Sequence, residues 1–403
     1  MTLRLIWRNL FRNRRRSLIT MASVAFAVLL AITFRSLQMG VFRNLIRNVA
    51  GMHTGYLQIH LNGYQDEPTL ENSFRADSLQ QMLHLKFDTL YPLLPRLECF
   101  ALVSGDSVTK GAMVIGTDAK MENRLTGIEK RIINGTMPDS AGILVSEGLA
   151  ADLRISTGDT VVVFGQGYEG SIAAGKYVVS GTVHFASPGL NSGLVYLSLP
   201  TAQELFSAYG RLTSAVVILK DDKDLETIRD RVAAGIGSEY ETVTWKKILP
   251  DIENHIQADT VFFFIEIGVL YIVIAFGIFG TLIMMMNERR RENSMLLAVG
   301  MKNIRMGWIL FVETVLLGGI GAITGIILSY PVVSYLTLNP IRFSGRTAAV
   351  FEQFGFEPIF PATVDPIIFL QQGIIIFGLS VLLGFYPFIS ALRMNPLTSL
   401  RNA

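Results

Sequence analysis

The sequence predicts an α-helical membrane protein with four transmembrane helices, one before and three after a large inserted α+β domain. Half of its 403 residues are hydrophobic. Four stretches hold no Asp, Glu, Lys or Arg: residues 17–34, 267–287, 314–341 and 366–392. A helix rises about 1.5 Å per residue, so each stretch can cross roughly 30 Å of hydrocarbon. The long segment of mixed composition between the first and second stretches predicts the inserted domain.

Charge separates the inserted segment from the rest of the chain. Residues 40–259 hold 19 Lys and Arg against 26 Asp and Glu, a net charge of −7, so the remainder of this +2 chain carries +9. An acidic domain argues against nucleic acid as a partner. Basic residues cluster in 4–16 and 289–305, so the positive-inside rule predicts cytoplasmic termini and an external inserted domain. Arg35, Arg43 and Arg47 oppose this orientation but are outnumbered.

The first hydrophobic stretch has a second interpretation. A basic start followed by an apolar run is typical of a signal peptide, and Ala25-Phe26-Ala27 has the form of a cleavage site. The apolar run continues past it to Phe34, which favours a spanning helix.

Hydropathy divides the chain into ten expected segments. Residues 3–11 place apolar side chains at helical spacing opposite arginines, which predicts an interfacial helix, with a simple basic flank as the alternative. The expected segments are an amphipathic interfacial helix (1–16), a first span (17–39), a two-lobed α+β domain (40–244), a stalk (245–259), a second span (260–286), a cytoplasmic coupling loop or helix (287–305), a third span (306–336), an outer loop (337–365), a fourth span (366–391) and a cytoplasmic tail (392–403).

The inserted segment alternates strand-like runs with short helical patterns, which is typical of a mixed α+β domain. The run 143–164 predicts strand, helix, turn and strand, with the turn at Gly158-Asp159. The other expected elements are a strand over 56–60, a helix over 75–94 ending at Pro95, strands near 99–104 and 112–116, a helix near 118–126, two strands over 176–185 and 193–199, a helix opening at Pro200 and Thr201, and a closing strand and helix.

One short motif suggests a nucleotide site. In GQGYEGSIAAGK (165–176), three glycines fit G-x-G-x-x-G, while Gly170, Gly175 and Lys176 fit most of the phosphate loop G-x-x-x-x-G-K-[ST]. Either motif needs a helix after its glycines. The residues that follow instead alternate like a strand, and Tyr177 stands where Ser or Thr is required. We therefore expect a glycine-rich hairpin loop.

Spacing reveals no catalytic or metal-binding constellation. The five histidines, at positions 53, 60, 84, 184 and 255, show no metal-ligand spacing. His53 and His60 are seven apart and would lie on opposite faces of a continuous strand. Cys99 is the only cysteine, so the chain has no intrachain disulfide. We expect neither a metal nor a catalytic residue in this chain.

Three charges lie in or near the predicted hydrocarbon region, where an unpaired charge is costly. Arg35 and Glu266 lie near the outer ends of the first two spans and are expected to pair. Glu313, inside the third span, is expected to meet arginines of the cytoplasmic loop. Snorkelling to the headgroups is the alternative for each. Small residues that allow close helix contact, within or between subunits, are Gly277, Gly280, Gly318, Gly321 and Gly325.

The loop after the second span carries the most specific pattern. NERRRENSMLLAVGMKNIRMGWILFVETVLLGGIGAITG (287–325) resembles the signature of the FtsX-like permease family. These are transmembrane subunits of ATP-binding cassette (ABC) transporters, including the lipoprotein-releasing and macrolide-exporter types. The matching residues are Glu288, Arg289, Arg291, Glu292, Leu296, Leu297, Ala298 and Gly300, followed by Glu313 in the next helix. Asn293-Ser294 departs from the family's apolar residue and glycine, which bears on the local shape of the coupling helix.

The resemblance covers nearly the whole chain. Residues 8–20 and 387–401 resemble the family's N-terminal interfacial helix and its C-terminal end. Residues 114–119, 143–163, 193–205 and 244–256 are similar to the external domain and stalk of the lipoprotein-releasing branch.

The resemblance implies a permease that pairs with a second copy or a related permease. Two cytoplasmic ATPase subunits would bind the loop between the second and third spans, and ATP and magnesium would be held by those separate chains rather than by this one. ATP-driven closure would then move the external domain through the stalk. The residues implied in coupling are Glu288, Arg289, Arg291, Glu292, Met295, Leu296, Leu297, Ala298, Gly300 and Met301.

The favoured function is the permease of a lipoprotein-releasing or related hydrophobic-cargo ABC system in the inner membrane of a Gram-negative bacterium. Its cargo would be a lipoprotein, a lipid or a hydrophobic peptide. The alternatives are the permease of a tripartite peptide or drug efflux system, a mechanotransmitting regulator of a cell-wall hydrolase, and a membrane-anchored receptor without an ATPase. The size of the inserted domain disfavours the regulator, and the coupling-loop pattern disfavours the receptor.

Overall fold

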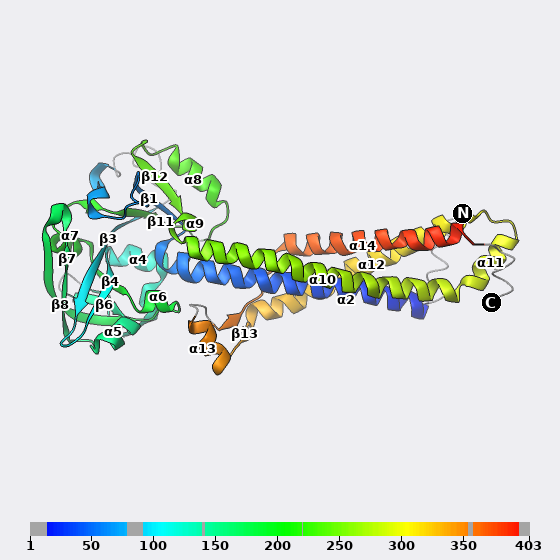
Figure 1. Cartoon of the computed structure of the whole chain (residues 1–403), viewed down its shortest axis with the longest axis horizontal. Helices are drawn as coiled ribbons and strands as arrows, with labels where there is room; N and C mark the ends of the chain where they lie inside the picture. Colours follow the sequence, from blue (N-terminus) through cyan, green and yellow to red (C-terminus); the bar gives the residue numbers. More distant parts are fainter. Residues whose placement is uncertain (1–13, 79–91, 139–141, 220, 354–357, 395–403) are drawn as a thin grey trace. The chain divides into compact units, whose positions relative to one another are not determined.

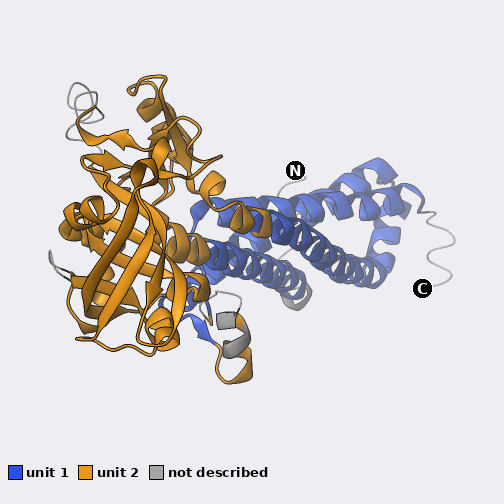
Figure 2. Ribbon diagram, turned by 60° about the vertical axis from the view of Figure 1, so that its left-hand side comes forward, with its two compact units in different colours: residues 1–42, 256–342, 359–403 blue, residues 43–255, 343–358 orange. Residues whose placement is uncertain are grey.

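The computed structural model describes residues 14–78, 92–138, 142–219, 221–353 and 358–394. Most of the expected interfacial helix and C-terminal tail therefore lie outside the described residues. The chain forms two compact units (Figure 2). The membrane unit comprises residues 1–42, 256–342 and 359–403, and the inserted domain comprises residues 43–255 and 343–358.

Four helices in the described part of the chain are long and apolar enough to cross a membrane (Figure 1). One precedes and three follow the bulk of the inserted domain, which confirms the predicted 1+3 arrangement. Within hydrocarbon a helix satisfies its own backbone hydrogen bonds, so these apolar runs take this form. Their bounds are α2 (Arg14–Ile46), α10 (Pro250–Glu288), α12 (Asn303–Leu338) and α14 (Pro366–Leu392).

Local signals set the ends of these helices. Pro250 opens α10, with Asp251 and Glu253 in its first turn, where carboxylates favour the positive end of the helix dipole. Asp365 caps α14 by accepting a hydrogen bond from the Ile367 N–H at 3.0 Å. After α2 the chain forms a π-helix, η1 (Arg47–Thr54), which ends at Gly55 with a φ of +76°. The expected stalk is helical, with α9 (Trp245–Ile248) preceding α10.

The membrane unit has an apolar core to which all four long helices contribute. Its fully buried side chains include Val28 of α2, Leu282 of α10, Leu317 of α12 and Ile376 of α14. Beyond α12 the chain makes a short hairpin of β13 (Ile341–Arg342) and β14 (Ile359–Phe360), and α13 (Arg346–Gln353) lies between them in sequence.

The inserted domain contains a ten-stranded mixed sheet in the order β12-β1-β11-β3-β4-β9-β6-β8-β5, with β7 paired to both β3 and β8. β3 pairs with β11 through its first residues and with β7 through its last. Because β7 also pairs with β8, strands β3, β4, β9, β6, β8 and β7 form a closed ring of pairings. The strands are β1 (Leu57–Leu61), β3 (Leu93–Ser104), β4 (Thr109–Thr117), β5 (Ile132–Gly135), β6 (Gly142–Ser146), β7 (Thr160–Gln166), β8 (Ile172–Val183), β9 (Leu194–Ser198), β11 (Ser214–Val217) and β12 (Tyr240–Thr244).

Short helices cover this sheet, and two further strands of two residues each pair separately from it. The apolar core beneath α5 and α7 includes Leu97, Val114, Val163 and Phe206. The remaining elements are η2 (Leu70–Asn72), β2 (Phe74–Arg75), α4 (Ala119–Thr126), η3 (Ile128–Arg131), α5 (Glu147–Leu153), η4 (Tyr168–Gly170), α6 (Pro188–Asn191), α7 (Leu199–Leu205), β10 (Arg211–Leu212, paired with β2) and α8 (Leu225–Ala233).

The C-terminal end of one predicted helix is wrong. The helix predicted over 75–94 was to stop at Pro95, but β3 already begins at Leu93 and runs through Pro95. Residues 79–91 lie outside the described part. Pro95 is tolerated because β4 pairs with β3 only from Arg96 onward, so the missing N–H faces no strand on that side.

The glycine-rich segment 165–176 is a hairpin, as expected. β7 and β8 are antiparallel, with Gln166 opposite Ile172, and η4 forms the turn. Gly170 has a φ of +72°, and a Cβ at Gly167 would lie 2.6 Å from the Phe206 carbonyl oxygen. A strand follows the glycines, so the helix N-terminus that both nucleotide motifs require is missing from this segment.

Candidate functional site

Helix α11 (Arg290–Ala298) occupies the middle of the loop predicted to couple to an ATPase. α10 ends at Glu288, and Arg289 has φ −93° and ψ 6°, so the helix direction changes at this residue. Gly300 has a φ of +103°, a conformation that favours glycine, and α12 begins at Asn303. The loop is therefore a short helix set between two breaks.

The two faces of α11 differ in polarity and exposure. Met295, Leu296 and Val299 are exposed at 54%, 40% and 88% of their surface. Leu297 lies on the opposite, buried face, together with Ser294. It packs in a cluster with Met286, Met306, Leu310 and Ala391.

This geometry changes the expected role of Leu297. The resemblance implies that Leu297 takes part in coupling to an ATPase, but residues three and four apart share a helix face, and Leu297 follows the buried Asn293 and Ser294 at that spacing. Its side chain packs within the membrane unit. Of the other predicted coupling residues, Glu288, Arg291, Ala298 and Gly300 are exposed, Glu292 and Met301 are half-buried, and Arg289 is buried.

Ser294 explains why the departure from the family pattern is tolerated. It occupies the position of the family's glycine and is fully buried, and its hydroxyl donates to the Arg290 carbonyl at 2.8 Å. A small side chain that satisfies its own polar group fits this contact, so α11 remains helical.

Arg289 and Glu313 form a buried ion pair. Arg289 Nη1 lies 2.5 Å from Glu313 Oε1, and the two side chains are 6% and 0% exposed. The sequence predicted that Glu313 would meet an arginine of the loop, and the structure identifies Arg289 as that residue. The pair joins the α10–α11 junction to the first third of α12.

Arg35 and Glu266 do not pair as expected. Arg35 donates to the side-chain carbonyl of Gln38 one turn along α2, and its guanidinium lies 4.9 Å from the ring centroid of Phe263. Glu266 is exposed on α10. A guanidinium over an aromatic face gains a favourable interaction without a carboxylate, which accounts for the arrangement.

The predicted packing glycines separate into two groups. A Cβ on Gly318 would lie 2.7 Å from Ser380 of α14, and one on Gly321 or Gly325 would approach α2 within 2.7 Å. These glycines therefore serve packing within one subunit. Gly277 and Gly280 of α10 have nothing within 4 Å of an added Cβ.

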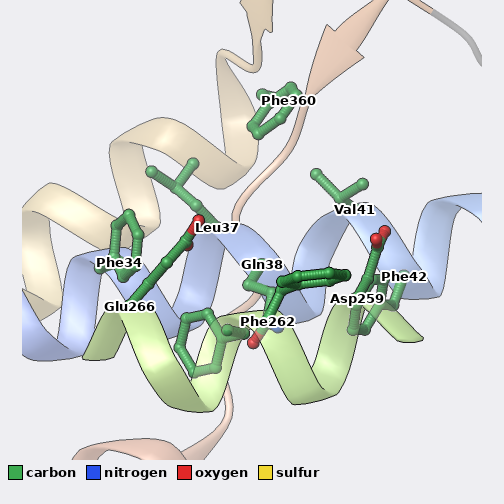
Figure 3. A pocket seen from close by; sticks show the side chains of 10 residues that line it. Phe34, Leu37, Gln38, Val41, Phe42, Asp259, Phe262, Glu266 and Phe360 are labelled. Atoms are coloured by element: carbon green, nitrogen blue, oxygen red, sulfur yellow. The ribbon is translucent and has the colours of Figure 1, made fainter. Parts of the chain in front are cut away.

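A cavity of about 320 Å³ lies between the membrane-unit parts of α2 and α10 (Figure 3). Its wall is mainly aromatic and aliphatic, and Phe262 and Phe34 are 65% and 42% exposed beside it. Two carboxylates add a polar edge. The lining residues are Phe34, Leu37, Gln38, Val41, Phe42, Asp259, Phe262, Phe263, Glu266 and Phe360.

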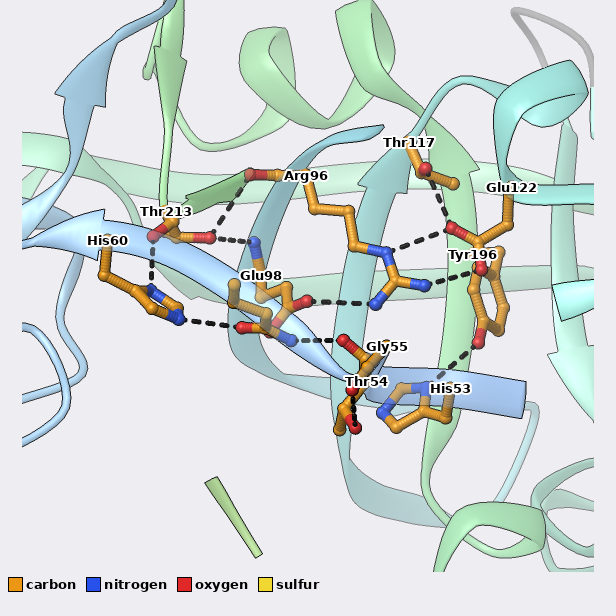
Figure 4. Close-up of polar contacts among 11 residues, drawn as sticks. His53, Thr54, Gly55, His60, Arg96, Glu98, Thr117, Glu122, Tyr196 and Thr213 are labelled. Carbon is orange, nitrogen blue, oxygen red and sulfur yellow. Dashed lines mark hydrogen bonds and ion pairs between the residues drawn. The ribbon is translucent and has the colours of Figure 1, made fainter. Parts of the chain in front are cut away.

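The inserted domain holds a second buried ion pair, which the sequence analysis missed (Figure 4). Arg96 of β3 donates to both carboxylate oxygens of Glu122 in α4, at 3.0 and 2.6 Å, and both side chains are fully buried. Thr117 also donates to Glu122 at 3.0 Å. Burial alone would lower the pKa of Arg96, but the carboxylates of Glu122 and Glu98 raise it above its ordinary value. A lone arginine inside the apolar run LLPRLECF was the available signal.

Polar contacts also attach η1 to the sheet. His53 Nδ1 lies 3.3 Å from the Tyr196 hydroxyl of β9, and Arg131 donates to the Met52 carbonyl at 3.2 Å. His53 lies in a π-helix and His60 in β1, so the two histidines do not share one continuous strand. The chain turns at Gly55 between them, which spacing does not reveal.

One face of the sheet is apolar and exposed. Phe100 of β3 lies opposite Met113 of β4, and Leu102 of β3 lies opposite Phe164 of β7. These four side chains are between 37% and 66% exposed. Contiguous apolar surface of this kind often marks a contact with another molecule. We call these residues the apolar sheet face.

Nothing in the described residues resembles a metal centre, since no group of three His, Cys, Asp or Glu side chains is placed to hold an ion there. Burial, followed by the Glu98 charge, raises the pKa of the Cys99 thiol above its ordinary range. Cys99 is 5% exposed, so it behaves as a small core residue and not as a reactive thiol.

Two protein-family models match the chain. The MacB-like periplasmic core domain matches residues 17–234, which is more than half of the chain. The FtsX-like permease C-terminal model matches residues 264–396. The chain belongs to the FtsX- and MacB-type ABC transporter permeases. This permease assignment covers both the inserted domain and the last three spanning helices.

A curated relative supports the same family. It is an uncharacterised ABC transporter permease of Methanocaldococcus jannaschii, 21% identical over 255 residues. The match covers 62% of this permease and 59% of the relative, so the chain spans less than two thirds of that protein's length.

Solved structures with similarity to the permease are distant. The periplasmic region of MacB from Actinobacillus actinomycetemcomitans is 15% identical, with a TM-score of 0.36 over 52% of this chain and 98% of that one. The extracellular domain of the transporter YknZ from Gram-positive bacteria is 11% identical, with a TM-score of 0.32 over 47% and 100%. The family assignment rests on the family models and not on these likenesses.

Proposed function

We propose that this permease is the membrane subunit of an ATP-driven transporter that extracts or moves a lipoprotein or another hydrophobic cargo. Two separate ATPase chains, which hold ATP and magnesium, dock on residues 287–305. Their closure is transmitted to the inserted domain. The permease pairs with a second copy or a related permease in the inner membrane of a Gram-negative bacterium, with both termini cytoplasmic and the inserted domain periplasmic.

The cavity between α2 and α10 is the observation that carries this proposal. Its lining is largely apolar, as the sites of apolar ligands are, and its volume of about 320 Å³ suits part of an acyl chain or an apolar side chain rather than a whole cargo. The partial exposure of Phe34 and Phe262 leaves the cavity open along the flank of the two helices. A hydrophobic chain could enter on the side of these two phenylalanines, with the two carboxylates at the edge of the cavity.

The exposed face of α11 supports the docking of an ATPase. Met295, Leu296 and Val299 form an apolar surface, with Glu288 and Arg291 exposed nearby. An apolar helix face inserted in a partner's groove is a common mode of recognition. The 165–176 segment, whose sequence suggests a phosphate loop, is a hairpin and supplies no helix N-terminus for a phosphate.

Photo-crosslinking tests the cargo assignment. A photoreactive amino acid at Phe262 should label a synthetic triacylated lipopeptide in nanodiscs, because this side chain lines the cavity. The matched control is Ile272, which is similarly exposed on the same helix, 58% against 65%, but does not line the cavity. We expect more adduct at Phe262 than at Ile272. Equal adduct at the two positions would mean contact with bulk lipid and would refute the cargo site.

The apolar sheet face favours a second candidate, export of a peptide or drug through a partner conduit. Phe100, Leu102, Met113 and Phe164 offer an apolar contact on the inserted domain that a periplasmic partner protein would cover. A regulator of a cell-wall hydrolase would use the same kind of contact. Changing Phe100 and Phe164 to Ser would abolish activity in a tripartite system and leave lipopeptide crosslinking at Phe262 unchanged.

A further inference from the structure

The junction between α10 and α11 is a point where the chain can bend. α10 ends at Glu288, α11 begins at Arg290, and Arg289 between them has non-helical angles. No side chain caps the start of α11. A load applied to α11 would therefore be absorbed by bending here unless another contact holds the angle.

The Arg289–Glu313 pair supplies such a contact. Arg289 is itself the junction residue, and its guanidinium lies 2.5 Å from the carboxylate of Glu313, which is fully buried in α12. Separating two buried opposite charges is costly, so the pair resists opening more strongly than an exposed one would. The pair thus ties the bend to α12.

The other end of the loop is tied as well. Asn303, the first residue of α12, donates from its side-chain amide to the Leu392 and Met394 carbonyl oxygens at 3.1 and 3.0 Å. These carbonyls lie at the end of α14. Between these two attachments in the sequence, Leu297 packs against Met306 and Ala391, and Gly300 has a positive φ of +103°.

α12 is in turn closely packed against two other helices. Gly318 contacts Ser380 of α14, and Gly321 and Gly325 contact Val24, Ala25 and Val28 of α2 at distances that exclude even a methyl group. Motion delivered to Glu313 would consequently move α2, α12 and α14 together. Close packing transmits displacement because such interfaces deform little.

We propose that Arg289 and Glu313 form a latch that fixes the angle of α11 against α12, so that force from a docked ATPase reaches the helices instead of bending the α10–α11 junction. Both are positioning residues. Glu313 and Arg289 are both buried within the membrane unit. The proposal rests on the docking of an ATPase at 287–305, and it predicts that opening the latch separates ATPase binding from ATPase stimulation.

The test uses the full-length permease in nanodiscs with the ABC ATPase that co-purifies with it. Glu313→Gln removes the charge and keeps the shape. We expect the affinity of the ATPase to stay within about twofold, while the permease-dependent increase in ATP turnover falls at least about fivefold, the range of a coupling effect. The ATP KM should not change. Thr314→Val is the control, because it removes a buried hydroxyl from the neighbouring residue without touching the pair.

The charge-swapped variant Arg289→Glu/Glu313→Arg guards against a folding artefact. It should recover at least half of the stimulation that Glu313→Gln loses. Full stimulation in Glu313→Gln would overturn the latch, and so would a swapped variant that melts like the wild type yet stays unstimulated. If the wild-type permease itself bound no ATPase, the proposed function would fail instead, and the binding measurement separates that outcome from the others.

Discussion

The inserted domain and the membrane unit each bury an arginine–glutamate pair, but the two pairs lie in different surroundings. Arg96 and Glu122 make two hydrogen bonds between β3 and α4, with Thr117 adding a third, inside a continuous core. Arg289 lies at a break between two helices and beside the exposed face of α11. Regular structure surrounds Arg96 and Glu122, so this pair stabilises the fold of the inserted domain. Arg289 and Glu313 join helices that could otherwise rotate, so this pair sets the angle between α11 and α12.

The largest effect should come from breaking the pair in the inserted domain. Glu122→Gln removes the charge that accepts two hydrogen bonds from the buried Arg96 and leaves Arg96 with the Glu98 carboxylate at 3.5 Å, which should cost about 3 kcal/mol. For a domain of this size that corresponds to a melting temperature roughly 10 °C lower. Thermal unfolding followed by circular dichroism measures it.

The exposed Glu129→Gln is the matched control and should melt within about 1 °C of the wild type, since surface substitutions have small effects. If Glu122→Gln melted like this control, the pair would not stabilise the domain, and the contrast with Arg289–Glu313 would disappear.

Adding a methyl group to a glycine of α12, the helix that carries Glu313, should loosen the packing of this helix against α2. Gly325→Ala places a Cβ 2.6 Å from the Ala25 carbonyl oxygen and should destabilise the membrane unit by about 1–3 kcal/mol, as overpacking does. Gly277→Ala, the same change in α10 with open space around it, should be neutral. Thermal melts of both variants in the same detergent measure this difference in stability, and equal stability would contradict the close packing of α12 with α2.

The smallest expected effect concerns the two faces of α11. Met295→Asp should lower ATPase affinity about tenfold, close to 1.4 kcal/mol, and leave the melting temperature unchanged, because Met295 is exposed. Leu297→Asp should instead lower the melting temperature, because Leu297 is buried in the cluster with Met306 and Leu310. Titration of the ATPase and a thermal melt distinguish the two. A loss of affinity for Leu297→Asp alone would restore Leu297 as a docking residue.

Most of the inserted domain's elements were visible in the sequence, because alternation and turn residues act locally. The run 143–164 gives β6, α5 and β7, and Gly158 turns with a φ of +97°. The start of β3 was missed, since the tolerance of Pro95 depends on where β4 stops pairing. Likewise the buried role of Arg96 depends on Glu122, which lies 26 residues away in the chain.

The candidate site likewise combines features that the sequence predicts with features that depend on the tertiary structure. The coupling segment and Glu313 follow from a pattern of residues read along one helix and its loop. The cavity between α2 and α10 brings together residues 34–42 and 259–266, which no spacing connects. The expected Arg35–Glu266 pair does not form, because the sequence predicts that two residues lie at a similar depth in the membrane but not that their side chains point toward each other.

The sequence by itself determined the four spanning helices, the inserted α+β domain and the family, because hydrophobicity, charge bias and motif are properties of neighbouring residues. Only the tertiary structure decided which arginine meets Glu313, that Leu297 faces inward, and that the glycines of α12 are packed while those of α10 are open. These depend on which helix faces meet, and a helix face acquires its partner only when the chain has folded.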